Sequence, residues 1–189
     1  FPLYAGAASG LGLLQTPPLD LKQVEIIKGS SSTLYGGGAI AGLVNLISKT
    51  PTDEKELGFH LNGSSGRGFD INGFYGQRFN KIGTTIFAAH NRNWAYTPSG
   101  DFSAIPKFDR YVFNPKLFVY FSDKTKLNVG INTAIENRIG GDIHFIQGKG
   151  DTIHSYFEEN KTQRYSTQLS FDHKFNDKSF FNFKNSVSY

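Results

Sequence analysis

The side chains that could carry chemistry in this sequence are few and widely separated. The chain has 5 His and 0 Cys, and its histidines show no spacing such as His-x3-His that would place two imidazoles on one metal ion. The adjacent carboxylates Glu158 and Glu159 face apart on an extended strand, so they do not form an acid–base pair. Ser, His and Asp residues stand in no nucleophile–base motif. The residues therefore favour neither covalent catalysis nor a metal or cofactor site.

Binding chemistry has more support, because polar and aromatic side chains gather in or just before two long polar links, at about 97–110 and 138–161. Arginine and histidine donate charge-assisted hydrogen bonds, and aromatic rings stack on flat groups. These residue types suit a bulky, ring-bearing and often anionic ligand. The candidate ligand-binding residues are Trp94, Tyr96, Asp101, Arg138, His144, His154 and Tyr156, and Arg110 stands in the first link.

The segments that must position these links alternate between apolar and polar residues. The alternation is clear in four segments, at 111–121, 127–135, 165–175 and 181–189. It is weaker in 69–79 and mixed in 83–96. A period of two predicts strands with one apolar face and one polar face. Such segments exceed the ~5–6 residues usual in soluble proteins and match the roughly 9–11 of a tilted membrane strand.

Short turns alternate with the long links along the chain. Three turns, at 79–81, 121–124 and 175–178, each follow a phenylalanine. Outer-membrane barrels have short turns at one end and long loops at the other, so these turns should share one rim, with Gly100 and Lys149 on the opposite rim. The glycine-rich link at 65–68 fits this alternation only loosely, because it is short although its place in the order is that of a long loop.

The same period predicts which side chains meet lipid and which face the lumen. The predicted lipid-facing residues are Leu127, Val129, Ile131, Leu169, Phe171, Phe181 and Phe183. The predicted lumen-facing residues are Asn128, Asn132, Gln168, Ser170 and Asn182.

Composition agrees with long amphipathic strands rather than with other classes. The chain contains 18 phenylalanines and 9 tyrosines but a single Trp. This excess of Phe and Tyr suits strands whose outer face meets lipid and headgroups. No apolar run approaches the ~20 residues of a membrane helix. The net charge of +4 is spread along the chain, so no nucleic-acid partner is indicated.

One segment, LKQVEIIKGSSSTLYGGGAIAGLVNLISK at 21–49, is more specific than the rest. Its β-branched runs predict two strands of one small sheet, at 24–28 and 44–48, joined through a short turn at 31–35 that the glycines 36–38 end. A phosphate-binding loop would need a lysine after the glycines or a helix of useful length, and neither is present. An unrelated small α+β domain is the other alternative.

This segment resembles the C-terminal part of the plug domain of TonB-dependent outer-membrane receptors. The resemblance covers a Val-Glu strand ending in a basic residue and Gly at 24–29, Leu-Tyr-Gly at 34–36, a Gly-Ala turn at 38–42 and an apolar-Asn-apolar strand at 44–47. It implies energised uptake of a scarce ligand, such as a ferric siderophore or cobalamin, by a protein that is not an enzyme. A glycan importer of the same family is the alternative, and a passive porin or adhesin would lack this segment.

The resemblance also implies partners and further contact residues. Glu25 and Lys28 are expected to touch the barrel wall, and Tyr4 to lie in an apical plug loop that contacts the ligand. The implied partners are outer-membrane lipid of a Gram-negative bacterium, a small-molecule chelate or glycan, and the inner-membrane TonB energising complex. That complex would act through an N-terminal segment outside this sequence.

The sequence therefore predicts a mainly β fold: a fragment of a plugged transmembrane antiparallel β-barrel, with part of a small α+β plug domain. The predicted domains are the C-terminal part of the plug at 1–52 and the first barrel strands at 57–189, about seven of roughly 22 strands. The half-buried strands of a soluble β-sandwich also alternate, but such strands are shorter.

Overall fold

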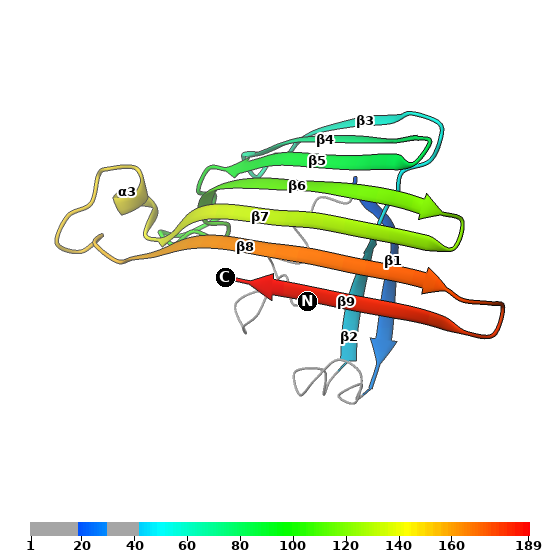
Figure 1. The fold of residues 1–189 in the computed structure, drawn as a ribbon. Helices are drawn as coiled ribbons and strands as arrows, with labels where there is room; N and C mark the ends of the chain where they lie inside the picture. The colour runs from blue at the N-terminus through cyan, green and yellow to red at the C-terminus, as the bar shows by residue number, and fades with distance from the viewer. Residues whose placement is uncertain (1–18, 30–41) are drawn as a thin grey trace. The chain divides into compact units, whose positions relative to one another are not determined.

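Seven antiparallel strands form a single sheet in which every strand pairs with its neighbours in sequence (Figure 1). The computed structural model describes residues 19–29 and 42–189, and the chain divides into two compact units, 1–49 and 50–189. The seven strands belong to the second unit and are β3 (Glu56–Gly63), β4 (Gly68–Phe79), β5 (Ile82–Asn93), β6 (Lys107–Ser122), β7 (Thr125–Gly141), β8 (Phe157–Lys174) and β9 (Phe180–Ser188). The prediction of a mainly β fold with antiparallel, sequentially paired strands is confirmed.

The sheet has two chemically different faces, because paired residues on neighbouring strands point to the same side. We call the face that carries Ile131 the outer face and the face that carries Asn132 the inner face. All the residues predicted to face lipid lie on the outer face, and the predicted lumen residues lie on the inner face. The outer face exposes large apolar side chains, among them Leu57, Phe59, Ile71, Ile86, Phe113, Leu117, Val129, Ile131, Phe181 and Phe183.

Buried phenylalanines occupy part of the inner face. Phe74 on β4 and Phe87 on β5 are direct cross-strand partners and are 3% and 2% exposed. A Cβ added at Gly76 would lie 3.2 Å from the Phe74 ring, so this glycine leaves room for the ring. Because β4 and β5 carry apolar residues on both faces, their alternation in the sequence is weak, although both are full 12-residue strands.

Nearer the end of the sheet that carries the long links, the inner face is polar. The Nδ2 atoms of Asn62 and Asn91 donate to the two carboxylate oxygens of Asp70, at 2.9 and 2.8 Å. In the same cross-strand row, the Nε atom of Arg110 donates to Glu136 at 2.5 Å. A buried charge is costly unless it is paired, and these contacts pair the charges on this face.

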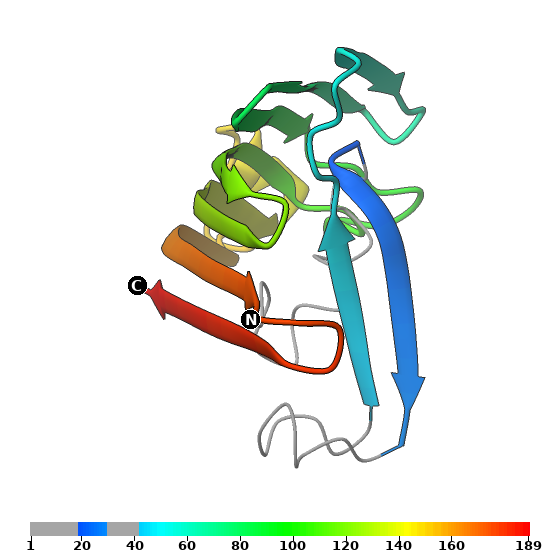
Figure 2. The ribbon, with the colours of Figure 1, turned by 45° about the vertical axis from the view of Figure 1, so that its right-hand side comes forward.

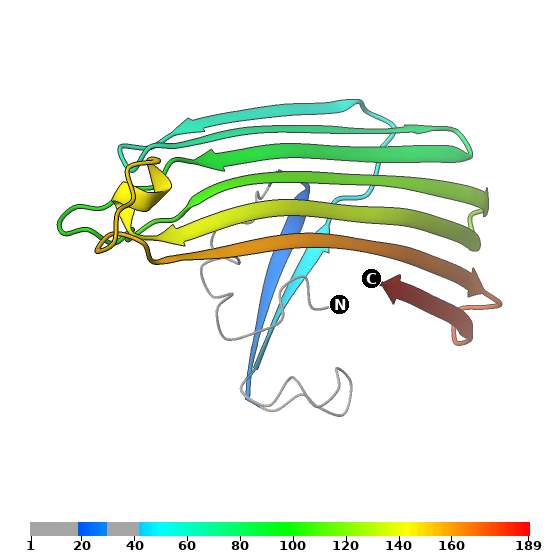
Figure 3. The ribbon, with the colours of Figure 1, turned by 90° about the vertical axis from the view of Figure 1, so that its left-hand side faces the viewer.

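The connections alternate between the two ends of the sheet (Figure 3). Turns 80–81, 123–124 and 175–179 lie at one end, and links 64–67, 94–106 and 142–156 lie at the other. The prediction that Gly100 and Lys149 lie on the rim opposite the short turns is confirmed. Asn80 takes a left-handed backbone conformation, with φ 54°, which allows the two-residue turn. Seen more nearly along the strands, the sheet is curved (Figure 2).

The links are shorter than the sequence predicted, because β6, β7 and β8 extend further toward them. The prediction that Arg110 and Arg138 stand in the links is wrong: Arg110 lies in β6 and Arg138 in β7. Both side chains are tolerated in strands because Glu136 forms an ion pair with each of them on the inner face. No helix in the described part of the chain is long and apolar enough to cross a membrane.

The segment that precedes β3 is held against the turn end of the sheet. The backbone N–H of Arg78 donates to the carbonyl of Thr52 at 2.7 Å. Pro51 lies over Gly83, where an added Cβ would approach the proline Cγ to 2.6 Å. Glycine at position 83 therefore allows the close packing of Pro51.

The first unit contains a separate two-stranded antiparallel sheet of β1 (Leu21–Lys28) and β2 (Gly42–Ser48). The two predicted plug strands are thus confirmed, while the turn predicted at 31–35 lies outside the described residues. Glu25 accepts hydrogen bonds from Gln23 at 3.0 Å and from Asn45 on the neighbouring strand at 2.9 Å. The expected contact of Glu25 and Lys28 with a barrel wall stays a prediction.

Replacing Phe87 with Ala tests the inner-face packing. We expect Phe87→Ala to lower the free energy of unfolding by about 3–5 kcal/mol, since it removes a fully buried ring and leaves a cavity beside Phe74. The control is Phe113→Ala on the outer face, where the ring is 49% exposed and little stability should be lost. Denaturant unfolding of the full-length protein measures both, and an equal loss in the two variants would contradict this packing.

Candidate ligand-binding site

The two long links meet at one end of the sheet, and we call links 94–106 and 142–156 together the loop platform. Its base is held by backbone contacts between the links. The N–H of Ile143 donates to the carbonyl of Asp101 at 2.7 Å, and Phe102 forms a β-bridge with Asp142. Ser103 donates its N–H to Gly141 at 2.8 Å and accepts from the Gly141 N–H through its hydroxyl at 3.0 Å. The loops are therefore joined where they leave the strands.

The first link is a short extension of the sheet that carries two of the predicted residues. Tyr96 bridges to Ile105, with hydrogen bonds of 3.0 Å in both directions. The Trp94 ring lies 4.8 Å from the guanidinium of Arg92, within the range of a cation–π contact. The buried Asn93 donates to the carbonyl groups at both ends of this link, which fixes where the link begins and ends.

Asp142 is the central polar residue of the second link. It is the N-cap of the short helix α3 (Ile143–Ile146), and its Oδ1 accepts from the N–H of His144 at 2.8 Å. Its other oxygen, Oδ2, lies 2.8 Å from Nδ1 of His154. The side chain is only 4% exposed. One carboxylate thus fixes both the start of the helix and the ring of a histidine twelve positions further on.

The two histidines of this link lie side by side. The rings of His144 and His154 are 4.4 Å apart between centroids, at an angle of 38°. Nε2 of His144 lies 3.8 Å from the carboxylate of Asp101 on the first link. Asp151 accepts from the backbone N–H of His154 at 2.8 Å, which closes the turn that returns to the strand. Three carboxylates therefore surround two imidazoles.

These contacts shift the ionisation of the groups involved. The hydrogen bond to Asp142 raises the pKa of His154, and the nearby carboxylates add to this effect while partial desolvation opposes it. Burial alone would raise the pKa of Asp142, but hydrogen bonds from His154 and from the His144 backbone outweigh it and lower that pKa. Backbone hydrogen bonds, first from His154, lower the pKa of Asp151. The arrangement favours an imidazolium held by ionised carboxylates.

Aromatic rings complete the platform. Phe145 and Phe157 stack at 4.3 Å with an angle of 7° between the rings, and Phe102 contacts Tyr156 at 6.0 Å. The Tyr156 hydroxyl donates a hydrogen bond to Glu158, which raises the pKa of the tyrosine. The ring of Tyr156 remains about half exposed, so its face is open to a partner.

Arg138 lies outside the platform, on the inner face of β7 just before it. Its Nε donates to Glu136 at 2.7 Å, and its guanidinium lies 4.7 Å from the Phe108 ring. Arg110 shares the same carboxylate and lies 5.7 Å from the same ring. Glu136 thus forms ion pairs with two guanidiniums at this point of the inner face.

Some of the residues predicted to bind ligand lie close together in the structure, and their role in binding stays a prediction. The structure brings Asp101, His144 and His154 together, with Tyr156 beside them. Trp94 and Tyr96 lie in link 94–106 of the platform, and Tyr4 lies outside the described residues.

Two acidic residues of the platform were missed in the sequence. The signal that could have found Asp142 and Asp151 is that each stands two or three residues before a histidine, the spacing of an N-cap or Asx turn.

The groups of the platform suit the binding of a ligand. Among the described residues, no group of three or more His, Cys, Asp or Glu side chains is arranged to hold a metal ion. What the platform offers is an imidazole pair, carboxylates and partly exposed aromatic rings. These groups recognise a ligand by hydrogen bonds and stacking.

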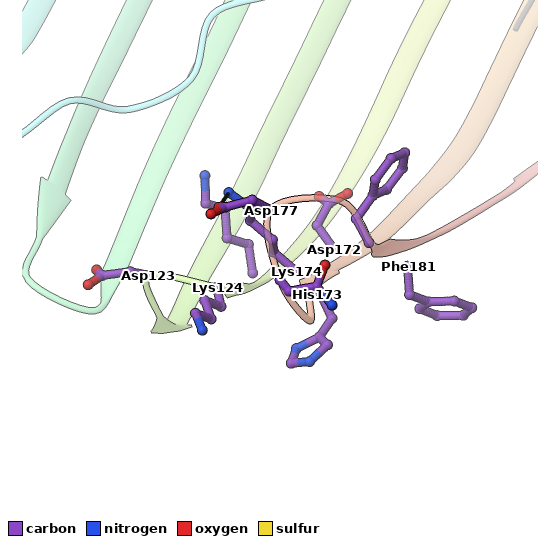
Figure 4. A pocket seen from close by; sticks show the side chains of 10 residues that line it. Asp123, Lys124, Asp172, His173, Lys174, Asp177 and Phe181 are labelled. Atoms are coloured by element: carbon purple, nitrogen blue, oxygen red, sulfur yellow. Dashed lines mark ion pairs between the residues drawn. The ribbon is translucent and has the colours of Figure 1, made fainter.

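A cavity of about 320 Å³ lies at the opposite end of the sheet, between turns 123–124 and 175–179 (Figure 4). Lys174 forms an ion pair with Asp177 at 2.8 Å across its rim. Lysine and aspartate line it in equal numbers, at Lys124, Lys126, Lys174, Asp123, Asp172 and Asp177. Their charges balance, so this cavity does not favour a charged ligand, and the loop platform is the better candidate site.

Comparison with known proteins finds a family match in the first unit and a fold likeness over most of the chain. Residues 1–43 match the family model of the TonB-dependent receptor plug domain. Over 37 residues the chain is 43% identical to the ferric enterobactin receptor PirA of Pseudomonas aeruginosa, an alignment covering 20% of this chain and 5% of PirA. The structure is similar to a chain in the solved structure of the FpvAI–pyocin S2 complex, with a TM-score of 0.73 and 16% identity.

The fold is mainly antiparallel β-sheet, and it is similar to that of the chain in the solved complex. The plug-family match over residues 1–43 and the sequentially paired sheet support a fragment of a TonB-dependent receptor. The structural likeness covers 90% of this chain and 23% of the chain in the solved complex.

The glycine at the base of the platform provides a test of its construction. Gly141 has φ +122°, and an added Cβ would lie 2.5 Å from the Tyr156 carbonyl oxygen. We expect Gly141→Ala to separate the ends of β7 and β8 and to expose link 142–156 to protease. Gly148→Ala is the control, since φ is +77° there but no heavy atom lies within 4 Å of the added Cβ, so only backbone strain of about 1 kcal/mol is added. Limited proteolysis compares the two, and equal cleavage would contradict the steric role of Gly141.

Proposed function

We propose that this protein takes up a scarce ligand across the outer membrane of a Gram-negative bacterium, and that the loop platform forms part of its outward-facing ligand-binding surface. The observation that carries the proposal is the order of the two parts. Plug-family sequence is followed directly by a sheet of long strands whose outer face is apolar. An exposed apolar face of this size needs a partner, and lipid is the partner that suits a continuous band.

The length of the apolar band on β6 supports a transmembrane sheet. Apolar outer-face side chains run from Phe121 to Tyr111, and the charged Asp109 follows. The residues from 121 to 111 span about 33 Å at ~3.3 Å per residue, or about 23 Å across the bilayer at a tilt near 45°. This matches the ~25 Å apolar band of outer-membrane barrels. The outer-face partners of Asp109, Arg92 and Asn137, are polar as well, so the band ends along one row.

A ferric siderophore is the ligand class we favour. The relative PirA is named as a ferric enterobactin receptor, and enterobactin-type chelates are bulky, anionic and ring-bearing. The platform offers matching chemistry in the His144–His154 pair and the exposed ring of Tyr156. Arg138 adds positive charge on the inner face beneath it. Energy for uptake would come from the inner-membrane TonB complex acting on the plug.

Growth on a single iron source tests the uptake proposal. A strain lacking this receptor should fail to grow when ferric enterobactin is its only iron source, and a plasmid copy should restore growth only in a background with an intact TonB complex. In that assay we expect Arg138→Ala combined with Tyr156→Ala to reduce iron uptake roughly tenfold, as loss of central anchors does. Asp177→Asn at the turn end is the control and should leave uptake unchanged. Growth restored without TonB would overturn energised uptake, and normal growth of the deletion strain on ferric enterobactin would overturn the proposed ligand.

Surface labelling tests the orientation. Single cysteines replacing Asp123, on the rim of short turns, and Lys149, in the platform, should differ in their reaction with a membrane-impermeant thiol reagent on intact cells. We expect labelling at position 149 only. Labelling at position 123 alone would place the short turns outside and remove the platform from the ligand side.

A further inference from the structure

We propose that Asp142 is the positioning residue of a proton-operated clasp: its two oxygens hold the backbone of His144 and the ring of His154 at the same time, so that link 142–156 is closed when His154 carries a proton and loosens when it loses it. The clasp itself follows from the geometry of the link. Its role in controlling ligand access rests on the function proposed above.

The geometry places the clasp where the link folds back on itself. Asp142 and His144 belong to the outgoing half of the link, next to β7, and His154 belongs to the returning half, next to β8. The contact of 2.8 Å between Oδ2 of Asp142 and Nδ1 of His154 ties these halves together. Backbone bonds within the outgoing half, such as that from the Lys149 N–H to the His144 carbonyl at 2.7 Å, do not depend on the returning half.

The charged groups around His154 favour the protonated form. Asp142 faces it from the start of α3, Asp151 from the turn before it, and Asp101 from the first link. His144 lies against it with ring centroids 4.4 Å apart. A charge-assisted hydrogen bond is about twice as strong as a neutral one, so the proton strengthens the tie.

The pH range follows from the directions of the shifts. Because the pKa of His154 is raised in the closed link, the stabilisation is fully present below about 6.5, the ordinary value for histidine, and is lost as pH rises through the raised value. The pKa values of Asp142 and Asp151 are lowered, so both carboxylates stay ionised at pH 5.5. Acidic surroundings therefore close the link, and alkaline ones loosen it.

The loosened form changes what the platform presents. Opening of the returning half separates His154 from His144 and moves the segment that leads into Tyr156. A receptor built in this way would present its assembled imidazole pair at low pH, as an imidazolium that suits an anionic ligand. Near pH 8.5 the same link would be more mobile and less charged.

Hydrogen exchange of the full-length receptor in detergent micelles tests the clasp without any ligand. After correction for the intrinsic pH dependence of exchange, we expect peptides from 142–156 to be roughly threefold to tenfold better protected at pH 5.5 than at pH 8.5. Peptides from 111–121 in β6 should show no such change. Mass spectrometry of the exchanged peptides reads both regions in one sample.

Two variants separate the clasp from the helix cap. In Asp142→Asn the amide oxygen still caps His144, because Asn is as good an N-cap as Asp, but the carboxylate is gone. We expect the link to keep its turn and to lose the pH dependence. His154→Gln should lose it too, and Asp177→Asn at the far end should retain it. An unchanged pH dependence in Asp142→Asn, or none in the parent, overturns the clasp.

The outcome is independent of the uptake assay. A pH-dependent link in a receptor that does not transport ferric enterobactin would leave the clasp standing and remove the proposed ligand. A receptor that transports ferric enterobactin but whose link is independent of pH would keep the proposed ligand and remove the clasp.

Discussion

The structure depends on one constraint, the unbroken antiparallel register of seven strands. Because side chains alternate along each strand, residues keep their face only while the pairing keeps its register. Six successive pairings preserve it from β3 to β9, with a single irregularity between Tyr120 and Ser122 at the end of β6. A slip of one residue would move Asp70, Arg110 and Glu136 to the apolar face. Charges in a lipid-facing position cost on the order of 2–4 kcal/mol each for Arg or Lys at mid-bilayer depth, so the register is strongly specified.

The same register builds the candidate site. Strands β6, β7 and β8 continue past the row where the outer face becomes polar, and their ends carry the two links that form the platform. The links meet because their strands lie next to one another, and backbone bonds at Asp101, Ser103 and Gly141 then fix the base. The polar part of the inner face lies just before the platform, with Arg110 and Arg138 around Glu136. Recognition groups and the ion pairs of Glu136 with two arginines therefore occupy one end of the sheet.

The sequence predicted those features that depend on local periodicity. Regular alternation, as from Leu127 to Ile135, assigned faces that the structure confirms. The alternation was weaker in β4 and β5, which are nevertheless strands, because Phe74 and Phe87 make the inner face apolar there and hide the period. It also ended the strands too early near Arg138, since the ion pair with Glu136 that makes this position compatible with a strand cannot be read from neighbouring residues. Asp142 was missed for a similar reason: its importance comes from His154, which only the folded link brings within reach.

Pairing only between sequence neighbours also has a kinetic consequence. Each strand finds its partner across a connection of a few residues to about fifteen, so the contacts of the sheet have low sequence separation for a β protein. Such a sheet can grow one hairpin at a time, with the strand already in place acting as the template for the next. Nucleation at the two-residue turn of Asn80 and Lys81 needs only a short loop to close. From this hairpin the sheet can grow in both directions, toward β3 and toward β9, by adding the strand that is next in the sequence.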